Sequence, residues 1–352
     1  MNRGLKTLWL LARVVAGVLG LALGAVIIGN LVTPVVDADA VAFAREQMPE
    51  LPLESRMVEA NGLRLHVVLA GPPEGVPVVL IHGHLDFWWG WNRQLPELAA
   101  AGLRLIIPDL PGFNESAKPR DLDAYRQDAI AADIHALIQA LGYESAYFVG
   151  YDSGAMVAWQ QAMRYPAAVA GLVSFGYGHP DAYRGLGLPL YARTIRLPGL
   201  VQSGALARIL RSFNWLPATS MIRAYGPGAF DEAELDLYRA AWSQEDSITT
   251  MFLWTLAKNP PVAPDVASTP IEAPVLIVAL PDDHLSPVEP ARRSVRYCSH
   301  AEVVEAPHAG HLFHRELPHR ASQLIVQFVH EISRGRSASL AIEQRAVKGF
   351  HR

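Results

Sequence analysis

Cysteine and charged residues are scarce in this chain, and no stretch of it is strongly basic. Among 352 residues only Cys298 is a cysteine, so the chain can form no internal disulfide and offers no cysteine nucleophile beside a plausible base. Charged residues make up 18% of the sequence, with a formal net charge of −4. Aromatic residues do not alternate with basic ones, so nucleic acid is not expected as a partner.

Short hydrophobic runs are what the chain has in abundance. A β-hairpin is expected within Leu51–Gly71, turning at Asn61-Gly62. Runs typical of buried parallel strands follow, separated by helical patterns such as Tyr125–Leu141 and Gly154–Tyr165. These runs are Val76–Ile81, Leu103–Pro108, Tyr147–Gly150, Gly171–Phe175 and Pro274–Ala279. The alternation predicts an α/β fold with a doubly wound, mostly parallel sheet.

The alternation stops between about Pro180 and Pro270. Helix-like stretches take its place: Ala205–Phe213, Asp231–Trp242 and Asp246–Lys258. Helices inserted over the carboxyl ends of the strands would form a lid that excludes water from a site. We therefore expect a core of residues 51–180 and 271–332, a helical cap of residues 181–270, and a tail of residues 333–352. The helix Pro318–Ile332 is expected to close the core.

The N-terminal segment has no charge over a long apolar run. Val14–Val36 would cross ~30 Å of hydrocarbon as a helix. Basic residues precede it and acidic ones follow, which favours a cytoplasmic N-terminus. We expect residues 1–36 to be a single-pass membrane anchor, with the globular part on the non-cytoplasmic side. A cleaved signal peptide, ending near Ala38-Asp39-Ala40, is the alternative, although the run exceeds the usual apolar length of such peptides.

A sharp turn after the third parallel run presents a carboxylate. Gly150 and Gly154 bracket Asp152 in the pattern of a nucleophile elbow, a tight turn between a strand and a helix. Ser153 would need glycines at positions 151 and 155 to be the bracketed residue. An aspartate is ionised near neutral pH and attacks without prior deprotonation. It suits displacement at a saturated carbon, which leaves an alkyl ester on the enzyme.

An ester on Asp152 must be hydrolysed by an activated water. His311 is the expected base and Asp283 its orienting acid, each in a loop after a late strand, and the order nucleophile, acid, histidine is typical of hydrolases with such an elbow. Asp282 is the alternative acid. The histidines at positions 308, 311 and 314 are a poor match to a metal site, because no carboxylate accompanies them. No metal or other cofactor is expected.

The hydrolysis step also needs donors to an oxyanion. The strand ending in Leu80-Ile81-His82-Gly83-His84 places the backbone N–H of His84 near that of Ser153, and we expect the pair to form the oxyanion hole. His82 is expected to pack and to form hydrogen bonds. Trp88 and Trp254 are candidates for lining the substrate pocket.

With these motifs the chain resembles the α/β-hydrolase superfamily, and within it the aspartate-nucleophile branch of epoxide hydrolases and haloalkane dehalogenases. The resemblance covers about Leu51 to Glu331. It rests on HGHLDFWWGW (82–91), PDLPGFNESAKP (108–119), VGYDSGA (149–155), the DD pair (282–283) and GH (310–311). It implies a hydrolase, with a small lipophilic epoxide as the first candidate substrate and a diol as product.

The same resemblance assigns roles in the cap. In epoxide hydrolases two cap tyrosines polarise the epoxide oxygen, and Tyr191 matches the first of them. Thr255 stands where the second is usual, so that donor is missing. Tyr183, Tyr225 and Tyr238 are open alternatives.

Two other functions stay open. Dehalogenases typically carry a tryptophan after the nucleophile and an asparagine after His-Gly, where this chain has Ser153 and His84. Leu85 replaces a common proline. A non-catalytic ligand-binding protein that retains the pocket is the third alternative. Nothing in the sequence indicates the oligomeric state.

Overall fold

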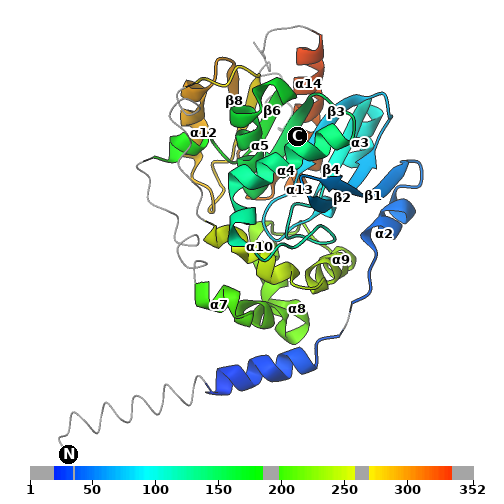
Figure 1. Cartoon of the computed structure of the whole chain (residues 1–352), viewed down its shortest axis with the longest axis vertical. Helices are drawn as coiled ribbons and strands as arrows, with labels where there is room; N and C mark the ends of the chain where they lie inside the picture. Colours follow the sequence, from blue (N-terminus) through cyan, green and yellow to red (C-terminus); the bar gives the residue numbers. More distant parts are fainter. Residues whose placement is uncertain (1–19, 35, 185–197, 258–268, 335–352) are drawn as a thin grey trace, which may run out of the picture.

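A twisted sheet of eight strands forms the centre of the molecule (Figure 1), within the residues that the computed structural model describes: 20–34, 36–184, 198–257 and 269–334. The strand order is β1-β2-β4-β3-β5-β6-β7-β8, with antiparallel pairs at β1–β2 and β2–β4 and parallel pairs elsewhere. The strands are β1 (Leu53–Ala60), β2 (Leu63–Ala70), β3 (Val76–Ile81), β4 (Leu103–Pro108), β5 (Ala146–Tyr151), β6 (Val169–Phe175), β7 (Val275–Ala279) and β8 (Ala301–Glu305). The predicted mostly parallel α/β sheet is confirmed.

The central and edge strands differ in burial. Every residue of β5 and β7 is buried, as expected for strands covered on both faces, whereas the edge strand β1 is mostly half-buried or exposed. The hairpin turns at Asn61 and Gly62, whose φ values of 50° and 79° are both positive. That conformation favours the Asn-Gly pair and fixes the register of β1 on β2.

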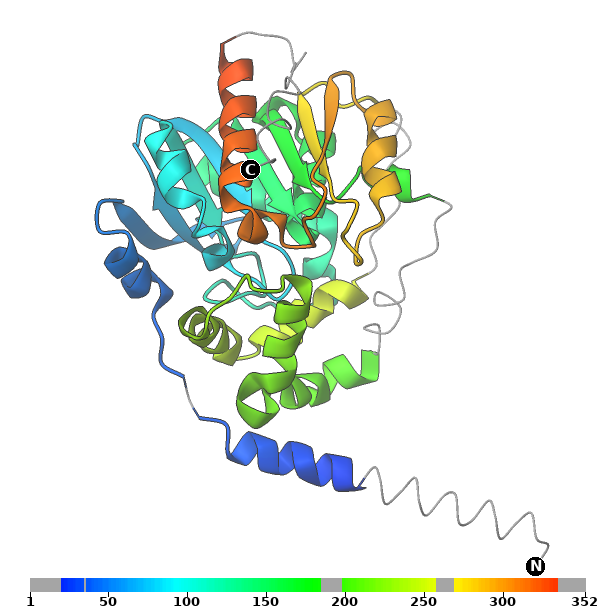
Figure 2. The same ribbon diagram turned by 180° about the vertical axis from the view of Figure 1, so that it is seen from behind.

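Helices cover both faces of the sheet. Figure 1 shows α4 and α5 in front of it, and Figure 2 shows α14 against the opposite face, where α14 also contacts α3. The core helices are α3 (Leu95–Ala100), α4 (Gln127–Ala140), α5 (Ser153–Arg164), α12 (Val288–Arg293), α13 (Phe313–Glu316) and α14 (Pro318–Ser333). The short 3₁₀ helices are η1 (Trp88–Trp91), η2 (Leu122–Tyr125), η3 (Pro166–Ala168), η4 (Pro180–Tyr183) and η5 (Ser294–Tyr297).

A layer of helices lies below the sheet in both views and follows β6 in the chain. It consists of α7 (Pro198–Gln202), α8 (Ala205–Tyr225), α9 (Glu232–Ser243) and α10 (Ser247–Leu256), and we call it the cap. Residues 212–215 break α8, with positive φ at Phe213, Asn214 and Trp215. The break lies where the helical pattern of the sequence ends, two residues before Pro217, which has no N–H to donate.

The N-terminal segment packs beneath the cap. Residues 20–31 are helical, and the side chains of Asn30 and Thr33 donate hydrogen bonds to the backbone carbonyls of Arg208 (2.8 Å) and Arg211 (3.0 Å) in α8. The chain then continues into α2 (Ala40–Gln47), which packs on β1.

The expected membrane anchor falls only partly on this segment. Positions 14–19 and 35 of the Val14–Val36 run lie outside the described residues, as does most of the predicted tail. Over the part that the structure describes, no helix has both the length and the apolar character needed to cross a membrane.

Candidate active site

Asp152 lies at the turn from β5 into α5, in a conformation that few side chains adopt. Its φ is 49° and its ψ is −127°, a strained combination for a residue with a Cβ. Glycines flank the turn because the backbone there is too crowded for a side chain. A methyl group at Gly150 would lie 2.5 Å from the backbone of Gly154, and one at Gly154 would clash with the carbonyls at the end of β3. The elbow therefore holds the carboxylate of Asp152 at the carboxyl edge of the sheet.

A backbone donor faces this carboxylate from the loop after β3. The N–H of His84 donates to Oδ2 of Asp152 at 2.8 Å. Ser153 is the first residue of α5, where backbone N–H groups have no partner within the helix. Its buried hydroxyl has no hydrogen-bond partner among the described residues. Of the two expected oxyanion donors, the N–H of His84 contacts the carboxylate directly, and Ser153 follows Asp152 in the chain.

The expected base and acid lie together at the same edge of the sheet. Nδ1 of His311 donates to Oδ2 of Asp283 at 2.9 Å, and both side chains are buried. Oδ1 of Asp283 accepts from the N–H of Leu285 at 2.8 Å, which fixes the carboxylate. Asp282 is exposed and accepts from the N–H of His308 instead, so Asp283 is the acid that contacts the histidine.

Negative charge surrounds the ring of His311. Burial alone would lower the pKa of His311, but the hydrogen bond to Asp283 and the charges of Asp152, Asp283 and Glu316 raise it above the usual value. Glu316 also accepts from the N–H groups of Gly310 (2.7 Å) and Leu312 (3.1 Å) and so holds the loop that carries His311. Sequence reasoning did not identify Glu316, although it lies five residues after the histidine.

The other two histidines of this loop lie elsewhere. His308 is exposed, and His314 is buried against the rings of Trp91 and Tyr151, with centroids 4.8 and 4.0 Å away. Within the described ranges no three His, Cys, Asp or Glu residues are grouped to hold a metal ion.

Asp86 joins the cap to the loop of residues 82–87, which carries the expected oxyanion donor His84 and is called the oxyanion loop. Its carboxylate accepts hydrogen bonds from the hydroxyls of Tyr238 in α9 (2.7 Å) and of Tyr151, the residue before the nucleophile. Burial and the charge of Asp86 raise the pKa of both tyrosines well above the usual value, so both remain protonated donors. One turn further along α9, Nε1 of Trp242 donates to the carbonyl of Leu85 at 2.9 Å.

The backbone of Leu85 itself is strained, with a φ of 61°. Leucine stands here in place of the proline that is common in the family that the chain resembles. Two side chains of α9, Tyr238 and Trp242, hold this part of the loop from the cap side. The sequence offered one sign of this arrangement, an acidic residue two positions after His84.

Few of the candidate cap residues lie near Asp152, Asp283 and His311, the expected catalytic triad. Tyr191 lies outside the described residues. The ring of Tyr225, at the end of α8, lies edge-on to that of His311 with centroids 5.6 Å apart. The hydroxyl of Thr255 donates to the carbonyl of Phe252 in its own helix. Tyr238 is engaged by Asp86, and the hydroxyl of Tyr183 accepts from the N–H of Gly178. Tyr225 thus contacts His311 through its ring.

The two tryptophans proposed for the pocket have different surroundings. Trp254 in α10 packs edge-on against Phe113, which also contacts the ring of His84. Its Nε1 donates to the carbonyl of Pro111. Trp88 is buried and lines a separate cavity beside α2. His82 packs against Phe113, and its ring bonds only backbone groups, as expected for a packing residue.

Known proteins with related sequences and structures identify the family of this chain. A family model described as alpha/beta hydrolase fold matches residues 76–316. The AB hydrolase superfamily protein YfhM of Bacillus subtilis is 29% identical over 290 residues, covering 79% of this chain and 98% of that protein. Epoxide hydrolase A of Mycobacterium tuberculosis is 27% identical over 319 residues, covering 78% and 96%.

Shorter and structural matches point the same way. Epoxide hydrolase B of Mycobacterium tuberculosis is 40% identical over 137 residues, a segment that spans 38% of this chain and 38% of that protein. The crystal structure of epoxide hydrolase A from Mycobacterium thermoresistibile superposes with a TM-score of 0.66 at 25% identity, covering 79% of this chain and 98% of the other. The chain therefore belongs to the α/β-hydrolase family, and its site and its relatives make it an epoxide hydrolase-like member.

Proposed function

We propose that the protein hydrolyses a small lipophilic epoxide to a diol through an ester on Asp152. One observation carries the proposal: a strained elbow presents a carboxylate, which attacks without a base, and this carboxylate accepts an N–H and lies within electrostatic reach of a buried histidine–aspartate pair. A carboxylate attacks an epoxide carbon directly and displaces the ring oxygen, and the resulting ester then needs the activated water that His311 supplies.

The first step uses the two oxygens of Asp152 differently. Oδ2 accepts from the N–H of His84, which leaves Oδ1 to attack an epoxide carbon. A C–O bond forms to Oδ1 while the ring C–O bond breaks, and the departing oxygen takes a proton from a cap hydroxyl. The ring of Tyr225 lies edge-on to that of His311, which supports Tyr225 for this role, and Tyr191 is the candidate implied by resemblance.

The second step frees the diol. His311 takes a proton from water, the hydroxide adds to the ester carbonyl, and the N–H groups of His84 and Ser153 stabilise the oxyanion at Oδ2. The intermediate collapses with cleavage of the bond between the acyl carbon and Oδ1, and the departing diol oxygen takes the proton held by His311. The proton lost as the carboxylate reforms returns to the cap hydroxyl. Esterification neutralises Asp152 and so removes one of the charges that raise the pKa of His311. His311 is therefore a free base more often in the ester than in the resting enzyme.

Trapping the ester tests this function. In His311→Gln the first step remains and the second fails, so intact-mass spectrometry after exposure to epoxides should show an adduct of the whole epoxide mass, which maps to Asp152. An alkyl adduct with halide released from haloalkanes would establish dehalogenation instead. Ligand binding with no adduct from either class would establish a non-catalytic binding protein.

Tyr225→Phe separates the two cap donors. If Tyr225 protonates the opening ring, this variant should form the adduct more slowly while hydrolysing a preformed ester at the normal rate. Tyr191→Phe is the matched control, and slowing in Tyr191→Phe alone would assign the donor to Tyr191.

The membrane anchor is a further part of the proposal. Six apolar residues of the N-terminal helix and the turn after it are 54–80% exposed, which is costly in water and favourable in hydrocarbon. They are Leu21, Leu23, Ile27, Ile28, Leu31 and Val32. The full chain should stay in membranes through an alkaline carbonate wash, and Leu23→Arg with Ile27→Arg should release it. Recovery of the unaltered chain in the wash would refute the anchor.

A further inference from the structure

Three adjacent strands bring together a second set of serine, histidine and aspartate, remote in sequence from the elbow. In the β1–β2 hairpin Ser55 pairs with Val68 and Met57 with His66, so Ser55 and His66 are diagonal neighbours. The N–H of Asp109, directly after β4, donates to the carbonyl of His66 at 2.9 Å and places the two side chains together.

The side chains of this set form a continuous hydrogen-bonded relay. Nδ1 of His66 lies 2.7 Å from Oδ2 of Asp109, and Nε2 of His66 lies 2.9 Å from Oγ of Ser55. Asp109 also accepts from the N–H of Trp88 (2.8 Å) and from the side-chain amide of Asn114 (2.7 Å). This order of contacts is that of a serine nucleophile with its base and orienting acid.

The surroundings determine where the protons lie. Burial alone would raise the pKa of Asp109, but the charge and hydrogen bond of His66 lower it below the usual value, so the carboxylate is ionised. An ionised acceptor requires that Nδ1 of His66 carry a hydrogen. In the neutral ring Nε2 then has the lone pair, and the hydroxyl of Ser55 donates to it.

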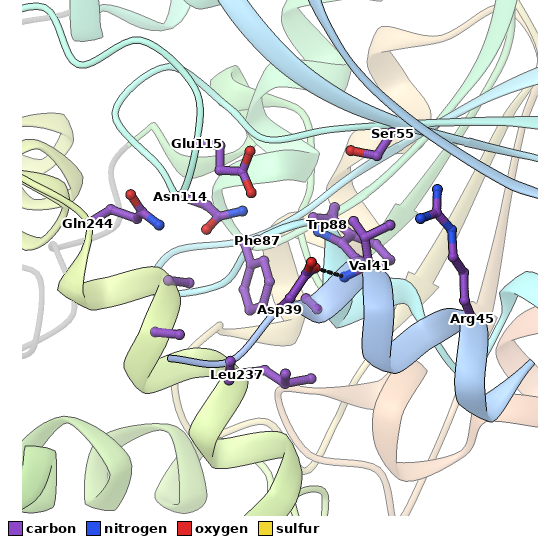
Figure 3. Close-up of a pocket in the computed structure, with 14 residues that line it drawn as sticks. Asp39, Val41, Arg45, Ser55, Phe87, Trp88, Asn114, Glu115, Leu237 and Gln244 are labelled. Atoms are coloured by element: carbon purple, nitrogen blue, oxygen red, sulfur yellow. Dashed lines mark hydrogen bonds between the residues drawn. The ribbon is translucent and has the colours of Figure 1, made fainter. Parts of the chain in front are cut away.

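Only the serine end of the relay reaches solvent. The side chains of His66 and Asp109 are 1% and 0% exposed, whereas Ser55 is half-buried and lines a cavity of about 400 Å³. Figure 3 shows Ser55 in this cavity with Arg45 of α2 on one side and Asn114 and Glu115 on the other. A small reagent can therefore approach the oxygen of Ser55 while the base stays shielded from water.

The walls of the cavity favour an uncharged reagent. Arg45 is its one cation among the lining residues, and Asp39 and Glu115 are its two carboxylates. Asp39 is occupied as the N-cap of α2, where it accepts from the N–H groups of Val41 and Ala42. An anionic ligand would meet both carboxylates, so a neutral ester fits best.

We propose that Ser55 is a second nucleophile, which takes an acyl or phosphonyl group from small, neutral, activated esters. Oγ of Ser55 attacks the carbonyl carbon or the phosphorus, its proton passes to Nε2 of His66, and the fluoride or alkoxide leaves with the electron pair of the broken bond. Ser55 lies inside a regular strand without the strained elbow of Asp152, and the modification is expected to be stoichiometric, one group per chain. The proposal is independent of the chemistry at Asp152.

A fluorophosphonate probe tests the proposal on the full chain. We expect peptide mapping to find the phosphonate on Ser55, at a rate about 10²-fold or more above that of an exposed serine such as Ser203, since a positioned base contributes about 10²–10⁴-fold. Ser55→Ala should lose this label. Ser153→Ala, the matched control at the elbow, and Asp152→Ala should retain it. Absence of label on Ser55, or label on Ser153 alone, would overturn the proposal.

The role of His66 has its own test. His66→Gln should slow labelling of Ser55 by about 10²-fold or more, the share of a general base. Should that variant fail to fold, the pH profile of the unaltered chain decides. Burial alone would lower the pKa of His66, but Asp109, Glu115 and Asp39 raise it, and Arg45 is the cation across the cavity. Labelling should therefore fall as pH drops through a value above that of an ordinary histidine, and a flat profile would contradict the relay.

Discussion

Two buried histidine–aspartate pairs of this molecule have nearly the same geometry and face different oxygens. Nδ1 lies 2.9 Å from the carboxylate in His311–Asp283 and 2.7 Å in His66–Asp109, and both histidines have a raised pKa. His311 lies in the field of the Asp152 carboxylate, whereas His66 contacts the hydroxyl of Ser55 at 2.9 Å. A hydroxyl needs its base before attack, and a carboxylate needs one only afterwards, so we propose that the two similar pairs act at different stages of two separate reactions.

The backbone around each pair also differs. Asp152 has a positive φ and accepts an N–H from the neighbouring loop, whereas Ser55 lies within the regular ladder of β1. Preorganised donors are commonly the largest contribution to acyl-transfer catalysis. The comparison teaches that a relay makes an oxygen reactive, while turnover also requires a site for the oxyanion.

Removing each nucleophile gives the largest separation between the two sites. Asp152→Ala should lower epoxide turnover by about 10⁴-fold or more, since the reacting oxygen is lost. Ser55→Ala should leave turnover unchanged. Steady-state rates of diol formation measure both, and a substantial loss in Ser55→Ala would merge the two sites into one.

The two bases should fail at different stages. His311→Gln should reduce turnover by about 10²–10⁴-fold through slow ester breakdown, with alkylation preserved. Rapid-quench measurement of the adduct distinguishes the stages. Loss of alkylation itself would show that His311 acts before the ester forms.

Low pH should slow the breakdown of the ester on Asp152. The pKa of His311 is raised above the usual value, so the ring is protonated, and inactive as a base, up to a higher pH than an ordinary histidine. Breakdown of the ester in single turnovers should rise with pH through the pKa that His311 has in the ester and then level. Because the ester lacks the charge of Asp152, its midpoint should lie below the midpoint measured for His311 in the resting protein by NMR titration. Coincident midpoints would exclude this coupling.

Breaking the contact between α9 and the oxyanion loop should have a smaller effect on turnover. The site of Ser55 has no equivalent contact among those described. Tyr238→Phe removes a hydroxyl that donates to the buried carboxylate of Asp86, a bond to a charged group worth about 1.5–3 kcal/mol. The free energy of unfolding should fall by that amount, and kcat should fall more than KM rises.

A matched control is Tyr297→Phe, which removes a half-buried hydroxyl donating to a neutral carbonyl, that of Asp181. Its cost should be about 0.5–1.5 kcal/mol, without an effect on kcat. Equal effects of the two variants on kcat would mean that the contact with Asp86 does not position the loop.

Local patterns in the sequence predicted the sheet and the surroundings of Asp152. Two glycines four residues apart predict the elbow because only glycine fits where α5 approaches β3. Contacts between segments that are distant in the sequence leave no comparable local pattern. The partners of Asp86 come from β5 and α9, and the Ser55 relay draws on three separate strands, so neither was predicted. The sequence pattern predicted a helix that ends at Phe213, whereas α8 continues beyond its break. A proline such as Pro217 is typical of a helix boundary and does not indicate that a helix follows.

The hydrogen bonds from Asn30 and Thr33 to α8 have a mechanical consequence. Thr33 is bound to the cap, and α2, which starts at Ala40, packs on the edge of the sheet. Six residues lie between these two attachment points, and the seven Cα-to-Cα steps from Thr33 to Ala40 reach about 25 Å when fully stretched. The N-terminal segment thus limits how far the cap can move from the sheet. A larger displacement of the cap requires that the hydrogen bonds of Asn30 and Thr33 to α8 break first.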